Sequence, residues 1–236
     1  WIDHILNGME GQGKLIVIES IERLFMERFG DPERCSSSSS FMISPVEAGI
    51  FSWSRVSEWT QVDLMRQWRT LSNLWQVHAN PMQPVGDWAV NVPLKRADLF
   101  SNKKSERLLY LKLDKLRLQW TPAQIDQAAA FLKTVQERVE RAGFGFALMI
   151  IPDKLHVYEG ELLTPLAAYP ATNLAKSLQQ EGVHAWDVLS PFRKDIYQVK
   201  DLYMPDDDHL GPTGQVALGQ VVIGSNELQD IKSAGK

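Results

Sequence analysis

The sequence lacks the features that would indicate a disulfide-rich, membrane-spanning or nucleic-acid-binding protein. Its 236 residues include one cysteine, Cys35, so neither an internal disulfide nor a multi-cysteine metal site can form. There is no run of about 18 apolar residues, so we expect no transmembrane span in this chain. Basic residues are not in excess, and the net charge of −4 argues against a nucleic acid as partner.

Hydrophobic residues are plentiful, at 44% of the chain, which is enough for a folded core. The continuous apolar runs KLIVIE (14–19) and FALMIIP (146–152) are typical of strands buried in a parallel sheet. A helix is predicted from Thr121, which starts a capping box, to Gly143, which ends it. We therefore expect both strands to lie in one sheet.

Weaker patterns predict the remaining elements. Apolar spacing predicts helices over 21–29, 163–181 and 213–222, a strand over 183–189, and a hairpin or bent edge strand over 107–120. This alternation of strands and helices predicts an α/β fold, a three-layer helix–sheet–helix sandwich with a mostly parallel sheet.

The domain organisation follows from the same patterns. Residues 1–236 are expected to form a single domain, in which residues 31–105 are an insert or cap because they show little strand pattern.

The segment PDDDHLGPTG (205–214) carries the strongest chemical pattern. His209 stands on a loop just before a helix, and in open α/β folds such loops lie at the carboxyl ends of the strands, where sites occur. Asp207 or Asp206 is placed to orient its imidazole, as in the base half of a Ser-His-Asp site. A solvated acidic loop or a weak metal site is the alternative, but the calcium-loop spacing is absent. We expect no metal and no cofactor.

This segment resembles the last block of the SGNH hydrolase superfamily, in which a glycine follows the histidine by five positions, as Gly214 does here. The resemblance is closest to the SGNH-like domain of the alginate O-acetyltransferase family, over about residues 121–222. That family's Asp-Thr-His-Trp element selects Asp207, whereas the superfamily's Asp-x-x-His selects Asp206. Leu210 replaces the family's tryptophan.

The same family has a Pro-x-Lys block followed by a tyrosine, and IIPDKLHVYEGEL (150–162) matches it. The resemblance implies that Lys154 and Tyr158 contact substrate or an anion. A solvated lysine and a packing tyrosine are the alternative interpretation.

The nucleophile is not marked by a Gly-Asp-Ser turn, which the sequence lacks. Ser20 follows the first strand and is one candidate. The family also has a strand ending in Glu, followed by Glu-Arg, which Glu19, Glu22 and Arg23 match. On that interpretation Ser20 is a spacer, Glu19 and Arg23 form an ion pair, and the serine lies before Trp1. A third alternative is that no nucleophile exists. Arg23 is also a candidate substrate-binding residue.

The resemblance implies O-acetyl transfer or O-deacetylation on an exported polysaccharide, in the periplasm or another extracytoplasmic space. A membrane-associated acyl-donor partner is implied in the same way. The polysaccharide and the compartment come from the resemblance alone. The alternative is a non-catalytic carbohydrate-binding or polysaccharide-assembly protein that retains the SGNH fold.

Overall fold

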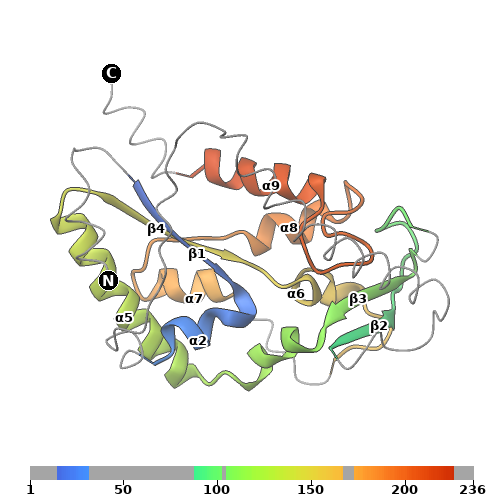
Figure 1. Cartoon of the computed structure of the whole chain (residues 1–236), viewed down its shortest axis with the longest axis horizontal. Coiled ribbons are helices and arrows are strands. Elements are labelled where there is room, and N and C mark those ends of the chain that lie inside the picture. Colours follow the sequence, from blue (N-terminus) through green and yellow to red (C-terminus); the bar gives the residue numbers. More distant parts are fainter. Residues whose placement is uncertain (1–14, 32–87, 103–104, 167–172, 226–236) are drawn as a thin grey trace, which may run out of the picture.

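A computed structural model describes residues 15–31, 88–102, 105–166 and 173–225 (Figure 1). Its main sheet has the strand order β1-β4-β5, and both neighbouring pairs are parallel. The strands are β1 (Leu15–Ile21), β4 (Gly145–Ile151) and β5 (Ala185–Trp186). The two apolar runs therefore lie side by side in one parallel sheet, as predicted.

Helices cover both faces of this sheet, as Figure 1 shows. One face carries α2 (Phe25–Phe29), α5 (Pro122–Arg141) and α7 (Leu174–Gln180), and the other carries α8 (Leu189–Asp195) and α9 (Pro212–Ile223). None of the described helices is long and apolar enough to cross a membrane.

Strand β4 separates two hydrophobic cores because successive side chains point to opposite faces. Phe146, Leu148 and Ile150 pack with α2, α5 and α7, whereas Ala147 and Met149 pack with α8 and α9. The three-layer helix–sheet–helix sandwich is thus confirmed, in agreement with an SGNH-like fold.

Helix α5 begins and ends where local chemistry predicts. Thr121 Oγ1 accepts from the Gln124 amide at 3.3 Å, and Gln124 Oε1 accepts from the Thr121 amide at 2.9 Å. Pro122 occupies the first turn, where its missing N–H costs nothing. Gly143 follows the helix at a φ of +85°, a conformation that favours glycine.

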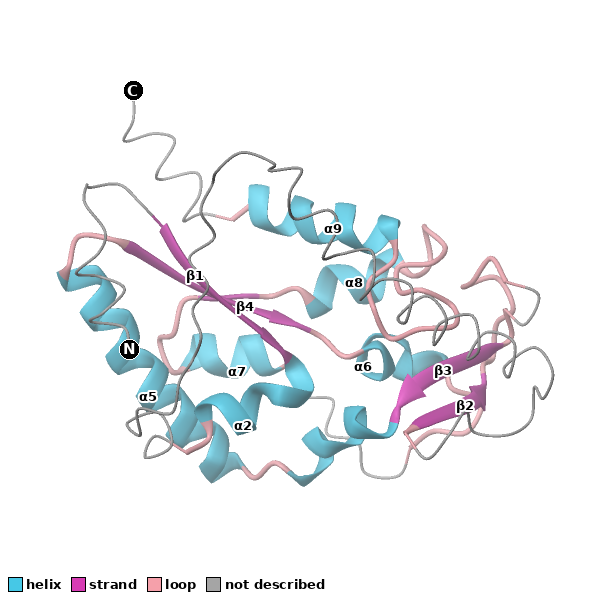
Figure 2. Cartoon of the chain, in the orientation of Figure 1, coloured by secondary structure: helices cyan, strands magenta, loops and turns pink. Residues whose placement is uncertain are grey.

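A second, smaller sheet lies beyond the carboxyl ends of the main strands (Figure 2). It pairs β2 (Ala89–Pro93) with β3 (Arg107–Leu111) in antiparallel fashion. Of the hairpin or bent edge strand predicted over 107–120, only the edge strand β3 is found, because the chain then continues as a 3-10 helix, η3 (Lys112–Gln119). Asp114 and Arg117 explain the difference, since a spacing of three on such a helix turns both buried side chains to one face.

Other boundaries also differ from the patterns. The strand predicted over 183–189 is limited to β5, because α8 begins at Leu189. The helix predicted over 21–29 is divided into η1 (Glu22–Leu24) and α2, because β1 extends to Ile21.

The remaining elements follow β4. These are α6 (Lys154–Tyr158), η4 (Glu159–Glu161) and, further along the chain, α7. The helix predicted over 163–181 is therefore only α7 in its described part, since residues 163–166 are not helical and 167–172 lie outside the described residues.

The domain division stays a prediction. Of the expected insert, residues 32–87 lie outside the described residues, and residues 88–102 contribute β2 to the small sheet. Cys35 also lies outside them.

Candidate active site

His209 lies on a tight loop, residues 204–209, which we call the His209 loop. An antiparallel bridge between Tyr203 and Leu210 closes its base. The Met204 amide donates to the His209 carbonyl at 2.9 Å, and the Gly211 amide donates to the Leu202 carbonyl at 3.0 Å. The histidine backbone is therefore held by main-chain bonds before its side chain makes any contact.

The imidazole of His209 is oriented by Asp207. Its Nδ1 lies 2.8 Å from Asp207 Oδ1 and 3.4 Å from Asp208 Oδ1. The hydrogen bond with Asp207 and its charge raise the pKa of His209 against the opposing effect of burial. The side chain is 75% exposed, so a partner can approach its other nitrogen, Nε2. This is the arrangement of a general base with its orienting carboxylate.

Asp206, the other candidate, points elsewhere. Its Oδ1 accepts a hydrogen bond from Asn102 Nδ2 at 3.1 Å. Asp207 therefore fills the orienting position, and it also accepts from the Asp208 amide at 2.6 Å. Burial raises the pKa of Asp207, but bonds from Asp208 and His209 outweigh this and hold its pKa below the usual value.

Glycines allow helix α9 to lie directly behind the His209 loop. A Cβ atom on Gly211 would stand 2.1 Å from the Asp201 carbonyl oxygen, and one on Gly214 would stand 2.0 Å from the Leu202 oxygen. No side chain fits at either distance. This close approach explains physically why a glycine stands five positions after His209.

Arg23 connects the His209 loop to the ends of the main strands. Its guanidinium lies 2.7 Å from Asp208, 3.0 Å from Asp153 and 3.3 Å from Asp114, and its side chain is 14% exposed. The three acids come from the His209 loop, the carboxyl end of β4 and η3. The expected ion pair with Glu19 is wrong, because β1 stays extended through Ile21 and Arg23 turns to these acids instead.

Arg23 faces three carboxylates in this cluster, and the pKa of each of them is raised. Burial raises the pKa of Asp114 to about 6, with the charge of Asp208 adding to the rise and Arg23 opposing it. Burial and the charges of Asp114 and Glu22 raise the pKa of Asp153 well above its ordinary value. Burial also raises the pKa of Asp208. The three carboxyl groups of this cluster therefore bind protons more readily than exposed carboxyl groups do.

Replacement of Asp114 by asparagine is expected to change how stability depends on pH. Because its pKa is higher in the folded state than in the unfolded chain, Asp114 makes the wild type lose stability as pH rises from about 4 to about 6. The Asp114→Asn variant should lack this loss. Urea unfolding at several pH values between 4 and 7 measures it, with Asp126→Asn on the exposed side of α5 as control. Parallel curves for wild type and Asp114→Asn would contradict the expectation.

Glu22 organises a second buried cluster next to the first. Its carboxylate lies 2.7 Å from His156 Nδ1 and accepts from the Asp153 amide at 3.0 Å. Arg117 lies 3.8 Å from Glu22 and 2.9 Å from Glu159. Burial raises the pKa of Glu22, but the bond to His156 and the charges of His156 and Arg117 lower it below the ordinary value. The adjacent Glu22 and Arg23 therefore each hold one charged cluster.

Lys154 and Tyr158 are both fully buried. The Lys154 ammonium donates to carbonyl oxygens of the His209 loop, and the Tyr158 ring packs against Phe100 and Tyr203 at centroid distances of 5.0 and 6.3 Å. Neither side chain reaches the surface where a substrate could contact it. Their geometry favours structural roles.

Ser20 is also fully buried. Its hydroxyl donates to the Ile21 carbonyl at 3.1 Å and accepts from Arg28 Nη1 at 3.4 Å. Within the described residues, no hydrogen bond joins Ser20 to His209. The structure therefore brings together His209, Asp207 and, through Asp208, Arg23, and it leaves Ser20 apart.

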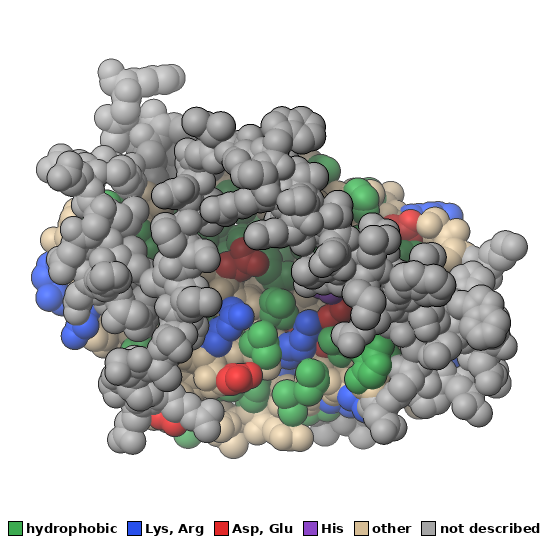
Figure 3. All heavy atoms as spheres, in the orientation of Figure 1, with side chains coloured by type: hydrophobic (Ala, Val, Ile, Leu, Met, Phe, Trp, Pro, Cys, Tyr) green, Lys and Arg blue, Asp and Glu red, His purple; other side chains and the backbone are tan. Residues whose placement is uncertain are grey.

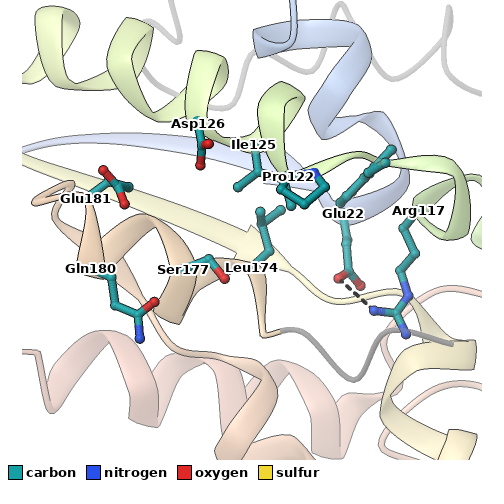
Figure 4. A pocket seen from close by; sticks show the side chains of 10 residues that line it. Glu22, Arg117, Pro122, Ile125, Asp126, Leu174, Ser177, Gln180 and Glu181 are labelled. Atoms are coloured by element: carbon teal, nitrogen blue, oxygen red, sulfur yellow. Dashed lines mark ion pairs between the residues drawn. The ribbon is translucent and has the colours of Figure 1, made fainter.

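A cavity of about 310 Å³ lies between α5 and α7, away from the His209 loop (Figure 4). Apolar side chains meet across it, and the Glu22–Arg117 ion pair closes one end. The lining residues are Glu22, Arg117, Trp120, Pro122, Ile125, Asp126, Leu174, Ser177, Gln180 and Glu181. Its volume is at the lower end for a small-molecule site. Neither His209 nor Asp207 lines it, so it is distinct from the candidate active site.

Asp207, Asp208 and His209 also offer ligand atoms within 4.8 Å of one another, close enough for a cation. In the described structure these atoms already serve other contacts, since Arg23 binds Asp208 and His209 binds Asp207. Figure 3 shows acidic, basic and histidine side chains gathered among apolar ones on one face of the molecule.

Sequence reasoning missed Asp114, Asp153 and His156. Asp114 stands at the break in an alternating apolar pattern, and the other two lie within the Pro-x-Lys block. The available signal was an acidic residue or a histidine inside an otherwise apolar segment. No local spacing links these positions to Arg23 or Glu22, so their partners could not be predicted.

Comparison with known families gives a match over half of the chain. Residues 106–225 match the family described as SGNH hydrolase-like domain, acetyltransferase AlgX. The match includes β4, α9 and the whole His209 loop. Searches of the curated proteins and of the solved structures found no match.

Proposed function

Because this chain belongs to the family of SGNH hydrolase-like domains of the acetyltransferase AlgX, we propose that it transfers or removes O-acetyl groups on an exported polysaccharide. The observation that carries the proposal is the Asp207–His209 pair at the carboxyl edge of the parallel sheet, with one face of the imidazole open. The site of action is periplasmic or otherwise extracytoplasmic, and a membrane-associated partner supplies the acyl group.

In the proposed mechanism, Asp207 accepts a hydrogen bond from the Nδ1–H of His209 and so fixes the tautomer that leaves a lone pair on Nε2. Nε2 takes the proton of a serine hydroxyl as the serine oxygen attacks the acetyl carbonyl carbon. Asp207 and Asp208 stabilise the imidazolium, which then gives its proton to the departing group. A sugar hydroxyl or water next attacks the acetyl-serine, with His209 again as base. Access of the acceptor decides between transferase and esterase.

The nucleophile in this proposal is a serine other than Ser20, in a segment outside the described residues. Burial of Ser20 and the use of its hydroxyl by Ile21 and Arg28 support this choice. A nucleophile must reach its base at about 2.6–3.2 Å, allowing for looser geometry without substrate. The match of Glu19, Glu22 and Arg23 to the family's Glu-x-x-Glu-Arg pattern gives Ser20 the role of a spacer.

Ser20→Ala is therefore expected to leave acetylesterase activity within about twofold of wild type, since no transition-state contact is removed. Hydrolysis of p-nitrophenyl acetate by the full-length protein measures it. Loss of activity comparable to that of a His209 variant would instead identify Ser20 as the nucleophile. Thermal unfolding of Ser20→Ala checks that any loss is not caused by misfolding.

The same assay tests the proposed function as a whole. Hydrolysis by the full-length wild type, and release of acetate from an acetylated polysaccharide, are the expected results. Absence of both, in a protein that still binds polysaccharide, would favour the non-catalytic carbohydrate-binding alternative, which the missing Gly-Asp-Ser turn suggests.

A further inference from the structure

Lys154 is the one lysine among the described residues that is fully buried. It begins helix α6, directly after the carboxyl end of β4. Its Nζ lies 2.6 Å from the Met204 carbonyl oxygen, 2.9 Å from that of Asp207 and 3.1 Å from that of Pro205. Burial lowers the pKa of Lys154 to about 7, against the opposing charges of Asp206, Asp207 and Asp208. In its ammonium form the side chain has three protons, so these three bonds use its full donor capacity.

All three acceptors belong to the His209 loop. They span its tip, from the residue that follows Tyr203 to the residue that orients His209. The Phe100 ring lies 4.9 Å from Nζ and adds a cation–π contact inside the protein. Beside the lysine, the Tyr203 hydroxyl donates to the Pro152 carbonyl, so the base of the loop is bound to the same segment.

We infer that Lys154 is a positioning residue for the Asp207–His209 pair: its buried ammonium gathers the carbonyls of the His209 loop and thereby sets the direction of the Asp207 side chain. The inference rests on the proposed function. It gives Lys154 a positioning role in place of the substrate contact that the family resemblance implies. The physical reason is that carbonyl dipoles pointing at one another repel, so a loop with three inward carbonyls needs a cation at its centre. Without it the loop would open, and His209 would lose its carboxylate.

The test is the pKa of His209, measured by NMR titration of its imidazole in the substrate-free, full-length protein. Lys154→Met keeps the length of the side chain and removes its donors and charge. If Lys154 positions the pair, the pKa of His209 should fall toward its ordinary value of 6.5, as it should in Asp207→Asn. If Lys154 acts only as a nearby positive charge, its removal should raise the pKa of His209. The sign of the shift separates the two roles.

Lys133→Met is the matched control. Lys133 also donates to a carbonyl oxygen, that of Gly182, at 2.7 Å, but it lies on α5. The Lys133→Met substitution should leave the pKa of His209 unchanged. An unchanged or raised pKa in Lys154→Met would overturn the inference, and so would an equal fall in Lys133→Met.

If the wild type is active, the kcat and KM of the Lys154→Met variant give a second test. Lys154→Met should lower kcat by about 10²-fold with KM little changed, because a small displacement of the base affects the chemical step more than binding. If the wild type proves inactive, the proposed function fails while the titration still decides the role of Lys154.

If Lys154→Met does not fold, a measurement on the wild-type protein tests the inference. An ammonium held by three carbonyls gives a slowly exchanging ¹⁵Nζ signal for Lys154, and a rapidly exchanging one would overturn the inference.

Discussion

His209→Ala is expected to lower kcat/KM for p-nitrophenyl acetate by about 10³-fold, within the 10²–10⁴ range of general acid–base catalysis. The imidazole is the one group of the site that both contacts Asp207 and remains open to a reacting hydroxyl. Its removal leaves the serine without a base, so the loss should appear in kcat rather than in KM. Initial rates over a range of substrate concentrations measure both.

The control for this prediction is His184→Ala. His184 is also exposed and lies 3.6 Å from a carboxylate, that of Glu140, but it precedes β5, at the amino end of that strand. Its removal should leave activity unchanged. Because the His209 side chain is exposed, its loss should not alter unfolding. If His209→Ala retained wild-type activity, the Asp207–His209 pair would not be the catalytic site.

Arg23→Met is expected to lower the free energy of unfolding by about 3–5 kcal/mol, the usual cost of removing one partner from a buried ion pair. It leaves Asp114, Asp153 and Asp208 facing one another in a largely buried space without their cation. Urea unfolding at pH 7 measures the loss. Activity should also fall, since Asp208 would no longer hold the His209 loop against the end of β1.

The pH dependence of this variant identifies the cause. The loss should grow as pH rises above about 6, the pKa of Asp114 with Arg23 present, and it should be smaller below that pH, where Asp114 is protonated in both proteins. The double variant Arg23→Met/Asp114→Asn should recover part of the stability at pH 7. Arg96→Met, which breaks the exposed pair with Asp98, should have no measurable effect. Equal losses at pH 5 and pH 7 would show that lost packing, not charge, is responsible.

The parts of the fold that the sequence predicted well depend on neighbouring residues. Strands β1 and β4 were recognised from continuous apolar runs, and α5 from the capping box at Thr121 and the glycine at position 143. These signals are local, so tertiary contacts need not be known to interpret them. The Asp207–His209 contact was also local, because the two residues are two positions apart.

The remaining features depend on contacts between distant segments. Residues 112–119 alternate apolar and charged side chains, which favours a strand, yet the buried partners of Asp114 and Arg117 impose a 3-10 helix. The buried position of Lys154 could not be inferred, since its carbonyl partners lie 50–53 residues further along the chain. A charged residue gives no local sign of whether its partner is water or protein.

The span of the Arg23 cluster has a consequence for the biosynthesis of the protein. Arg23 and Asp208 are separated by 185 positions, and the loop that carries Asp208 is among the last described segments to leave the ribosome. Until then, Arg23, which follows the first strand in η1, has an incomplete set of partners, and contacts of such long range form slowly. A nascent or truncated chain can therefore form α5 and its turn before Asp208 reaches Arg23. The salt bridge between Arg23 and Asp208 forms only when these two distant segments have met.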